Sequence, residues 1–365
     1  MTDVAEQLPG QDSSEYRRAI VARAGGQRDI ADTTRRLTAW LEDRLGGPVE
    51  IRDFRTPQGA GIANETWLID AEASGELHRL VVRVEPTQVQ IFPDPDFEGL
   101  YRLLDTLASE GLVRVPPVHW FESDTSVIGS RFLVMGLLDG RVPITEPPYA
   151  SHGFVAEATS AERRTLWESA VTELARVHLV PGELVSFIGW PQYGETGEDQ
   201  QLGYWENYRE WVGIELDDRT AELAGWIMAN RPHDPGVALS WGDARLGNMI
   251  FGDDHRLLGV LDWDQMSLAS AGHDLAWWLL FDEVNTTYKG LARPDGFGDR
   301  QETIDLWESV AGRALGDISW HEAYTCYKLI LITTRTMGAA GYPPERLAAS
   351  TGLFVKLGRD FAGLA

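Results

Sequence analysis

The order of strand and helix patterns along the chain constrains its fold more than any other sequence feature. Between residues 34 and 136, short apolar segments separated by turn residues predict strands, with one helical pattern inserted among them. From residue 137 onward, apolar residues recur mostly at helical spacing. This order predicts an α+β protein with two lobes, as suits 365 residues. We therefore expect an extension (1–33), a lobe with a small antiparallel sheet (34–136) and a larger helical lobe (137–365).

Individual elements can be assigned from the same periodicities. In the first lobe the sequence predicts helices at 34–46 and 96–110 and strands at 51–54, 66–69, 80–84 and 131–135. In the second lobe the clearest helical patterns cover 161–180, 204–216 and 321–337.

Charge and hydropathy argue against several kinds of partner. The chain has 32 Lys and Arg residues against 56 Asp and Glu residues, a net charge of −24. Such a surface repels nucleic-acid phosphates and anionic membranes, so we expect neither nucleic acid nor membrane as a partner. No apolar run approaches the roughly 20 residues that cross a bilayer. Because the first residues lack the basic start and apolar core of a signal peptide, we expect a cytoplasmic protein.

The residues with the clearest chemical meaning lie between 239 and 263. Asp243 and Asn248 are five positions apart on a loop that leads into an apolar strand, and a second apolar strand ends at Asp262. If these strands form a hairpin, the three side chains meet at one end of it. Phosphoryl transfer needs a carboxylate to accept the proton of the attacking hydroxyl, and oxygen ligands for Mg²⁺. We predict Asp243 as the base, Asn248 and Asp262 as Mg²⁺ ligands, and Arg245 as a further catalytic candidate.

This segment resembles the catalytic core of the aminoglycoside phosphotransferase and choline kinase-like family, which has the protein kinase-like fold. The family's His-Gly-Asp, Asn and Ile-Asp-Trp motifs appear here as residues 241–243, Asn248 and 261–263. Trp241 stands where His is usual, and residues 269–271 (Ala-Ser-Ala) stand where Gly-Asp-Pro is usual. The resemblance implies that both departures fall on supporting positions. It also implies that Asp274 braces the catalytic loop, with capping of the following helix as the alternative role.

The resemblance extends into the first lobe and implies nucleotide-binding residues there. Gly59, Gly61 and Asn64 lie in a stretch similar to the family's phosphate-covering loop, where glycines let N–H groups approach phosphate oxygens. Arg83 stands where kinases use Lys to grip the α and β phosphates, as in the family branch joined to acyl-CoA dehydrogenases. Glu98, on the next predicted helix, is the candidate partner of that cation.

The segment from Met135 to Leu137 resembles the hinge between the lobes, where adenine would hydrogen-bond to backbone groups. The implied phosphoryl donor is ATP with Mg²⁺, and GTP remains an alternative.

The expected acceptor is a hydroxyl group on a small molecule bound by the helical lobe. Aromatic and acidic residues gather in two helical segments there, at 204–218 and 264–283. Because carboxylates and aromatic faces suit a cationic amine, these segments favour an aminoglycoside-like molecule or another amino alcohol. Packing of the aromatic residues in a core, with solvated carboxylates, is the alternative.

Other functions stay open at this point. The branch that Arg83 suggests favours a hydroxyacyl compound as the acceptor. The departures at Trp241 and 269–271 allow a catalytically weak nucleotide-binding protein of the same fold. A metal-dependent phosphohydrolase fits less well, because the sequence shows no His and Asp cluster suited to two metal ions.

Overall fold

The computed structural model describes residues 28–56, 65–86, 89–93, 95–195, 197–233 and 236–364. These residues form two compact units. A β-rich unit contains the described residues up to Glu110, together with Val115–Asp139. A helical unit contains Gly111–Arg114 and the chain from Gly140 onward. No helix among the described residues is both long and apolar enough to cross a membrane.

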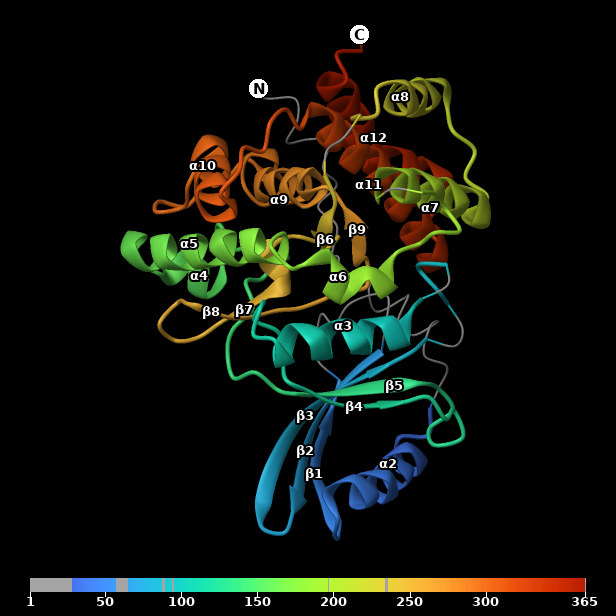
Figure 1. Ribbon diagram of the computed structural model, residues 1–365, viewed down its shortest axis with the longest axis vertical. Helices are drawn as coiled ribbons and strands as arrows, with labels where there is room; N and C mark the ends of the chain where they lie inside the picture. The colour runs from blue at the N-terminus through green and yellow to red at the C-terminus, as the bar shows by residue number, and fades with distance from the viewer. Residues whose placement is uncertain are drawn as a thin grey trace. The chain divides into compact units, whose positions relative to one another are not determined.

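The β-rich unit is a five-stranded antiparallel sheet with two helices (Figure 1). The strand order is β1-β2-β3-β5-β4, with β1 at Val49–Arg55, β2 at Glu65–Ala73, β3 at Glu76–Val84, β4 at Val118–Glu122 and β5 at Phe132–Gly136. The helices are α2 (Ile30–Leu45) and α3 (Phe97–Ser109). The predicted α+β class with its small antiparallel sheet is therefore confirmed. Strand β4 was not predicted, because the sequence VHWFE shows no clean apolar alternation.

The core of this unit explains why its segments take these forms. Buried side chains alternate along β2, with Trp67 and Ile69 on one face, and α2 packs Leu37 and Leu41 into the same cluster. Helix α2 begins four residues before its predicted start. The reason is Asp29, whose side chain accepts hydrogen bonds from two N–H groups of the first turn.

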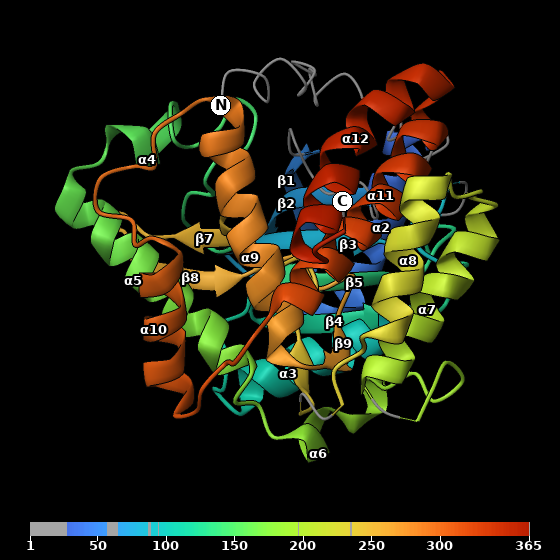
Figure 2. The ribbon, with the colours of Figure 1, turned by 90° about the horizontal axis from the view of Figure 1, so that it is seen from above.

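The helical unit consists mostly of helices, with α11 at its centre (Figure 2). Helix α11 contacts α7, α8, α9 and α12. Its helices are α4 (Gly153–Glu157), α5 (Ser160–Val177), α6 (Gly182–Val185), α7 (Gly197–Val212), α8 (Asp218–Ala229), α9 (Ala271–Asn285), α10 (Arg300–Ala311), α11 (Ser319–Ala340) and α12 (Pro344–Phe361). Short 3₁₀ turns are η1 (Ser186–Ile188), η2 (Leu246–Asn248) and η3 (Thr287–Lys289).

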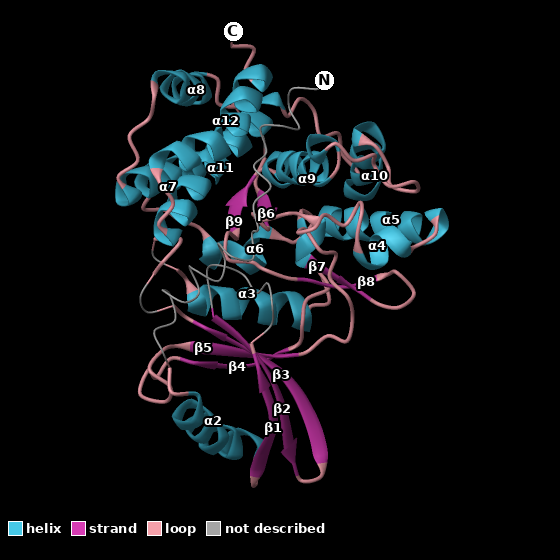
Figure 3. Ribbon diagram, turned by 180° about the vertical axis from the view of Figure 1, so that it is seen from behind, coloured by secondary structure: helices cyan, strands magenta, loops and turns pink. Residues whose placement is uncertain are grey.

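Two short antiparallel strand pairs carry the loops of this unit (Figure 3). Strand β6 (Ala238–Ser240) pairs with β9 (Ser267–Ala269), and β7 (Met249–Phe251) pairs with β8 (Leu257–Val260). The segment predicted to carry the chemistry lies between β6 and β9. The hairpin expected from the sequence is therefore present as β7 and β8.

Candidate active site

The candidate catalytic loop leaves β6, and a glycine sets its first turn. Gly242 has a φ of 90°, in the left-handed region. A Cβ atom at this position would lie 2.3 Å from the main-chain oxygen of Gln265. Any other residue would therefore be strained and would also collide with a neighbouring strand connection. This requirement explains the glycine that immediately precedes Asp243.

A buried carboxylate holds the same turn from helix α9. Asp274 is 0% exposed. Its Oδ1 accepts from Ser240 Oγ at 3.0 Å and from Gly242 N–H at 2.8 Å. Its Oδ2 accepts from Trp241 N–H at 2.7 Å and from His178 Nε2 at 3.0 Å. Burial alone would raise the pKa of Asp274, but the hydrogen bonds from His178, Gly242 and Trp241 bring it below its ordinary value.

The tautomer of His178 follows from the hydrogen bond that its Nδ1 accepts. Trp307 donates its indole N–H to Nδ1 of His178 at 2.9 Å, so the imidazole proton lies on Nε2, which faces Asp274. The cap position of α9 is Ser270, four residues before Asp274. The alternative that Asp274 caps α9 is therefore wrong. The contacts of Asp274 stabilise the turn of the loop that carries Asp243.

Three side chains hold Asp243 itself. Arg245 Nε lies 2.9 and 3.1 Å from the two carboxylate oxygens, Asn248 Nδ2 donates to Oδ2 at 2.7 Å, and Trp277 Nε1 donates to Oδ1 at 2.8 Å. The Asp243 side chain still keeps 14% of its surface exposed. It is fixed in orientation and remains reachable. The bond from Trp277 was not foreseen, although Trp277 follows Asp274 by three positions and so shares its helix face.

Arg245 forms an ion pair with Asp243, and its cation also lies over the ring of Phe281 at 5.7 Å. Burial works against the charged guanidinium, but Asp243 and Asp262 raise the pKa of Arg245 above its ordinary value. These contacts suit a residue that positions Asp243.

The β7–β8 hairpin positions the two predicted metal ligands. Asn248 immediately precedes β7, and its main-chain oxygen accepts from Leu261 N–H at 2.8 Å, which extends the strand pairing. Asp262 follows Leu261 directly, with a φ of 60°. Trp241 donates its indole N–H to the main-chain oxygens of Leu261 and Asp262, at 2.9 and 3.0 Å. The tryptophan that replaces the family's usual His therefore supports the backbone at Asp262.

The donor set at this end of the hairpin fits Mg²⁺. The amide nitrogen of Asn248 donates to the main-chain and side-chain oxygens of Asp243, which leaves its carboxamide oxygen for another partner. With the carboxylate of Asp262, it offers two hard oxygen ligands.

A buried network replaces the support expected from Gly-Asp-Pro. Ser270 N–H donates to Glu198 Oε1 at 3.0 Å, and its hydroxyl lies 2.7 Å from His321 Nε2. The other oxygen of Glu198 lies 2.7 Å from His273 Nε2. Burial opposes the charge of Glu198, but His273 brings its pKa to about 2, whereas burial lowers the pKa of His321 to about 3. Helices α7 and α11 thus hold the start of α9.

The nucleotide-binding residues predicted in the β-rich unit stay predictions. Gly59, Gly61 and Asn64 lie outside the described residues. Arg83 is 9% exposed on β3, opposite Leu133 of β5, and Glu98 lies in the first turn of α3.

Some backbone N–H groups of the predicted hinge already form hydrogen bonds within the β-rich unit. Met135 is in β5, opposite Val81. Gly136 N–H donates to the main-chain oxygen of Pro117 at 2.8 Å, and Leu137 N–H donates to that of Arg79 at 2.9 Å. Adenine contacts at Gly136 and Leu137 would therefore use carbonyl oxygens.

Several carboxylates expected to attract a cationic acceptor already have partners. Glu206 pairs with Arg209 at 3.0 Å, and both Asp282 and Glu283 pair with Arg293. The sequence showed the acidic residues but could not show which cations the fold brings to them. Ion pairs within the helical unit therefore neutralise much of the charge of these three carboxylates.

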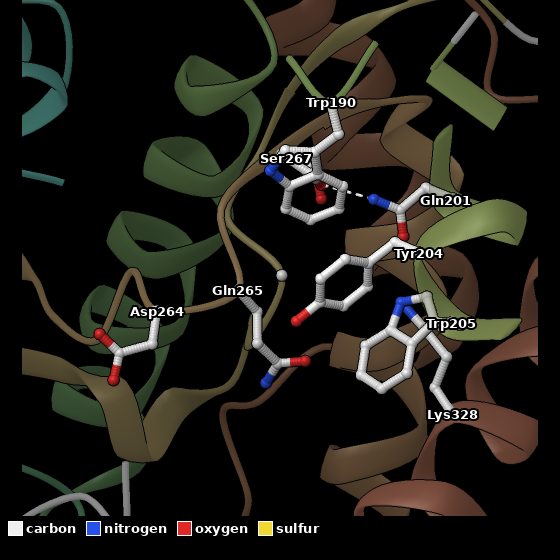
Figure 4. A pocket seen from close by; sticks show the side chains of 10 residues that line it. Trp190, Gln201, Tyr204, Trp205, Asp264, Gln265, Ser267 and Lys328 are labelled. Carbon is white, nitrogen blue, oxygen red and sulfur yellow. Dashed lines mark hydrogen bonds between the residues drawn. The ribbon is translucent and has the colours of Figure 1, made fainter. Parts of the chain in front are cut away.

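A narrow pocket of about 20 Å³ opens beside the catalytic loop, within the helical unit (Figure 4). Aromatic and polar side chains line it: Trp190, Gln201, Tyr204, Trp205, Ser240, Gly242, Asp264, Gln265, Ser267 and Lys328. Because Gly242 adjoins Asp243, this pocket is the candidate acceptor site.

An antiparallel sheet unit and a helical unit whose loop carries Asp243, braced by Asp274, are features of kinase-like phosphotransferases. The chain belongs to the phosphotransferase enzyme family, whose model matches residues 55–312. The resemblance inferred from the sequence motifs is therefore confirmed.

Curated relatives match only part of their own length. A protein of Arabidopsis thaliana described as a probable acyl-CoA dehydrogenase is 23% identical over 82% of this chain and 38% of its own length. Acyl-CoA dehydrogenase family member 11 of Homo sapiens is 26% identical over 71% of this chain and 33% of its own. The chain thus spans about a third of the length of these relatives.

Solved structures share the fold at low sequence identity. A protein assigned to the aminoglycoside phosphotransferases, from Ralstonia eutropha, has a TM-score of 0.68 and 22% identity, covering 90% of this chain and 98% of that one. Choline kinase from Streptococcus pneumoniae has a TM-score of 0.56 and 14% identity, with 90% and 99% covered. A spectinomycin phosphotransferase in complex with ADP and spectinomycin has a TM-score of 0.53 and 12% identity, with 90% and 98% covered. The kinase-like fold is therefore shown.

Proposed function

We propose that this protein transfers the γ-phosphoryl group of ATP to a hydroxyl group of a small molecule, in the presence of Mg²⁺. The observation that carries the proposal is the grouping of Asp243, Asn248 and Asp262. Asn248 hydrogen-bonds to Asp243 through its side chain and to Leu261 through its main chain, next to Asp262. A base and two oxygen ligands thus belong to one hairpin and its loop.

Asp243 is the proposed acceptor of the hydroxyl proton. As the acceptor oxygen forms a bond to the γ-phosphorus, its proton passes to the Asp243 carboxylate. The bond between the γ-phosphorus and the β–γ bridging oxygen breaks, and its electron pair leaves with ADP. The products are a phosphate monoester and ADP. Arg245, Asn248 and Trp277 keep the carboxylate oriented toward the hydroxyl.

Asn248 and Asp262 are the residues that would hold Mg²⁺. Bound Mg²⁺ supplies neutralisation of the charge on the β and γ phosphates. In the β-rich unit we propose Gly59, Gly61, Asn64, Arg83, Glu98, Met135 and Leu137 as the nucleotide-binding residues. The complexes of related folds with ADP or GDP support a nucleoside triphosphate as donor, with GTP as the alternative to ATP.

Two acceptor classes follow from the relatives. Proteins with the same fold include an aminoglycoside phosphotransferase and a choline kinase, which supports an amino alcohol as the acceptor. The curated relatives are acyl-CoA dehydrogenases, which supports a hydroxyacyl compound. A wider groove that shares Trp205 with the pocket is lined by Leu202, Ile227 and Met228, and would suit an apolar acyl chain.

ADP release with and without acceptors tests the proposal. The panel contains amino sugars, amino alcohols and hydroxyacyl compounds. A kinase needs an acceptor for turnover, a phosphohydrolase releases phosphate without one, and a nucleotide-binding scaffold shows neither activity. Turnover that is independent of every acceptor would overturn the proposal in favour of hydrolysis.

A further inference from the structure

A buried lysine, Lys328, contacts Trp277, which also donates a hydrogen bond to the proposed catalytic base Asp243. Lys328, on α11, is 3% exposed, and its Nζ lies 5.8 Å from the ring centre of Trp205, 5.1 Å from that of Trp277 and 5.5 Å from that of Tyr324. Within the described part of the chain, Nζ makes these cation–π contacts but no hydrogen bond or ion pair. Such burial of an ammonium group is unfavourable unless a partner meets it.

The carboxylates whose charges act on Lys328 do not serve as that partner. Asp274, Glu198 and Asp243 act on Lys328 through their charges but make no ion pair with it. Asp274 accepts from four donors, and Glu198 bonds to Ser270 and His273. The Asp243 carboxylate is held by Arg245, Asn248 and Trp277.

Lys328 remains charged in this setting. Burial lowers its pKa to about 8, and the three carboxylates oppose that shift. At pH 7 the charged form therefore still outweighs the neutral form by roughly ten to one. Lys328 is thus a buried, positively charged side chain, and it lines the pocket together with Gly242.

The pocket suits a small group that accepts hydrogen bonds. Its volume of about 20 Å³ is enough for a water molecule or the end of a small ligand, and too small for a sugar ring. Gln265 and Tyr204 add polar atoms to its wall. Asp264 also lines the pocket, but in Figure 4 its carboxylate points away from Gln265, Tyr204 and Trp205.

On the basis of the proposed function, we propose that Lys328 binds a carboxylate on the phosphate acceptor, which is therefore a hydroxy acid. The carboxylate supplies the partner that the ammonium lacks, and it anchors the acceptor in the pocket that Gly242, the residue before the base, helps to line. A cationic amine is excluded from the same position by like-charge repulsion. The expected acceptor is therefore an anionic rather than a cationic molecule, and Lys328 is the residue that selects it.

Matched acceptors separate charge recognition from general binding. The probes are ω-hydroxy acids from hydroxypropanoate to hydroxyhexanoate, each compared with its hydroxyalkanamide, which has the same length and no charge. The wild-type protein should prefer the acid in kcat/KM by about ten- to a hundredfold, as expected for a charged hydrogen bond. Lys328→Met should remove this preference, so that the acid and the amide of each pair have nearly equal kcat/KM.

A control variant removes an exposed positive charge elsewhere. Lys356, on α12, pairs with Asp360 and is half-exposed, so Lys356→Met lowers the net charge equally without touching the pocket. It should keep the preference for the acid. A merely structural role of Lys328 would lower the rates with acid and amide together and leave their ratio intact, which would overturn the proposal.

The remaining outcomes are also decisive. If Lys328→Met does not fold, protection of the wild-type protein against thermal unfolding replaces it: hydroxyhexanoate should protect and hydroxyhexanamide should not, and equal protection would refute the proposal. If the protein phosphorylates amino alcohols but no hydroxy acid, the role of Lys328 is wrong and the kinase function stands. If no hydroxyl compound supports ADP release, both fail.

Discussion

Replacement of Asp274 by Asn tests whether a single buried carboxylate holds the catalytic loop. Each carboxylate oxygen accepts from one main-chain N–H, Gly242 on Oδ1 and Trp241 on Oδ2. An Asn side chain has one oxygen and one NH₂ group. In either orientation, its NH₂ group therefore faces a main-chain N–H that cannot change its role.

The magnitude follows from the bonds lost. On the side of the NH₂ group the hydrogen bond from the main-chain N–H disappears, and the other donors lose the charge of their acceptor. A buried donor left without an acceptor costs about 1–3 kcal/mol. We therefore expect Asp274→Asn to lower the free energy of unfolding of the helical unit by about 3–6 kcal/mol. We also expect the loop to lose its fixed turn, so that phosphoryl transfer falls strongly.

Urea unfolding followed by tryptophan fluorescence measures the loss, and ADP release measures the activity. Asp254→Asn is the matched control, because Asp254 is exposed and accepts from the N–H of Arg256 in a surface turn. The control should change stability by less than about 0.5 kcal/mol. A loss below about 1 kcal/mol for Asp274→Asn, with full activity, would refute the bracing role.

Three further predictions concern the metal, the nucleotide and acid stability. Asp262→Ala should weaken Mg·ATP binding in calorimetry and leave metal-free ATP binding unchanged; equal losses would contradict its role as a ligand. Arg83→Ala should weaken ATP binding at least tenfold, and unchanged affinity would show that another cation grips the phosphates. His321 protonates near pH 6.5 when unfolded but only near 3 when folded, so its contribution to stability is complete above pH 6.5 and falls as the pH drops toward 3. Glu198 adds a loss in the same direction below pH 4.5, and a urea midpoint constant between pH 7 and 4 would contradict both shifts.

The sequence predicted the fold well because its signals are local. Short apolar segments between turns marked β2 and β3, helical spacing marked α5 and α11, and Gly242 and Asp243 marked the loop. The hairpin geometry of Asn248 and Asp262 also followed from local pattern, because strand pairing brings strand ends together.

What the sequence could not show were partners distant in the chain. The contact of His178 with Trp307 joins residues 129 positions apart. The pairing of Glu283 with Arg293, which removes an apparent attraction for cations, depends on how a loop folds back. In the sequence, Lys328 is one of several polar residues in a partly apolar helix. Only the packing of three aromatic rings around it shows that its charge is buried.

³¹P NMR of Mg·ATP with the best acceptor of the panel, recorded for the wild-type protein and for Asp243→Asn, shows directly whether the protein makes a phosphate ester and whether Asp243 is needed for it. With the wild-type protein, the γ-phosphate signal of ATP should disappear and the signals of a phosphate monoester and ADP should replace it. The variant should bind ATP and produce neither. Release of inorganic phosphate without ester, or unimpaired ester formation by Asp243→Asn, would contradict the proposed mechanism.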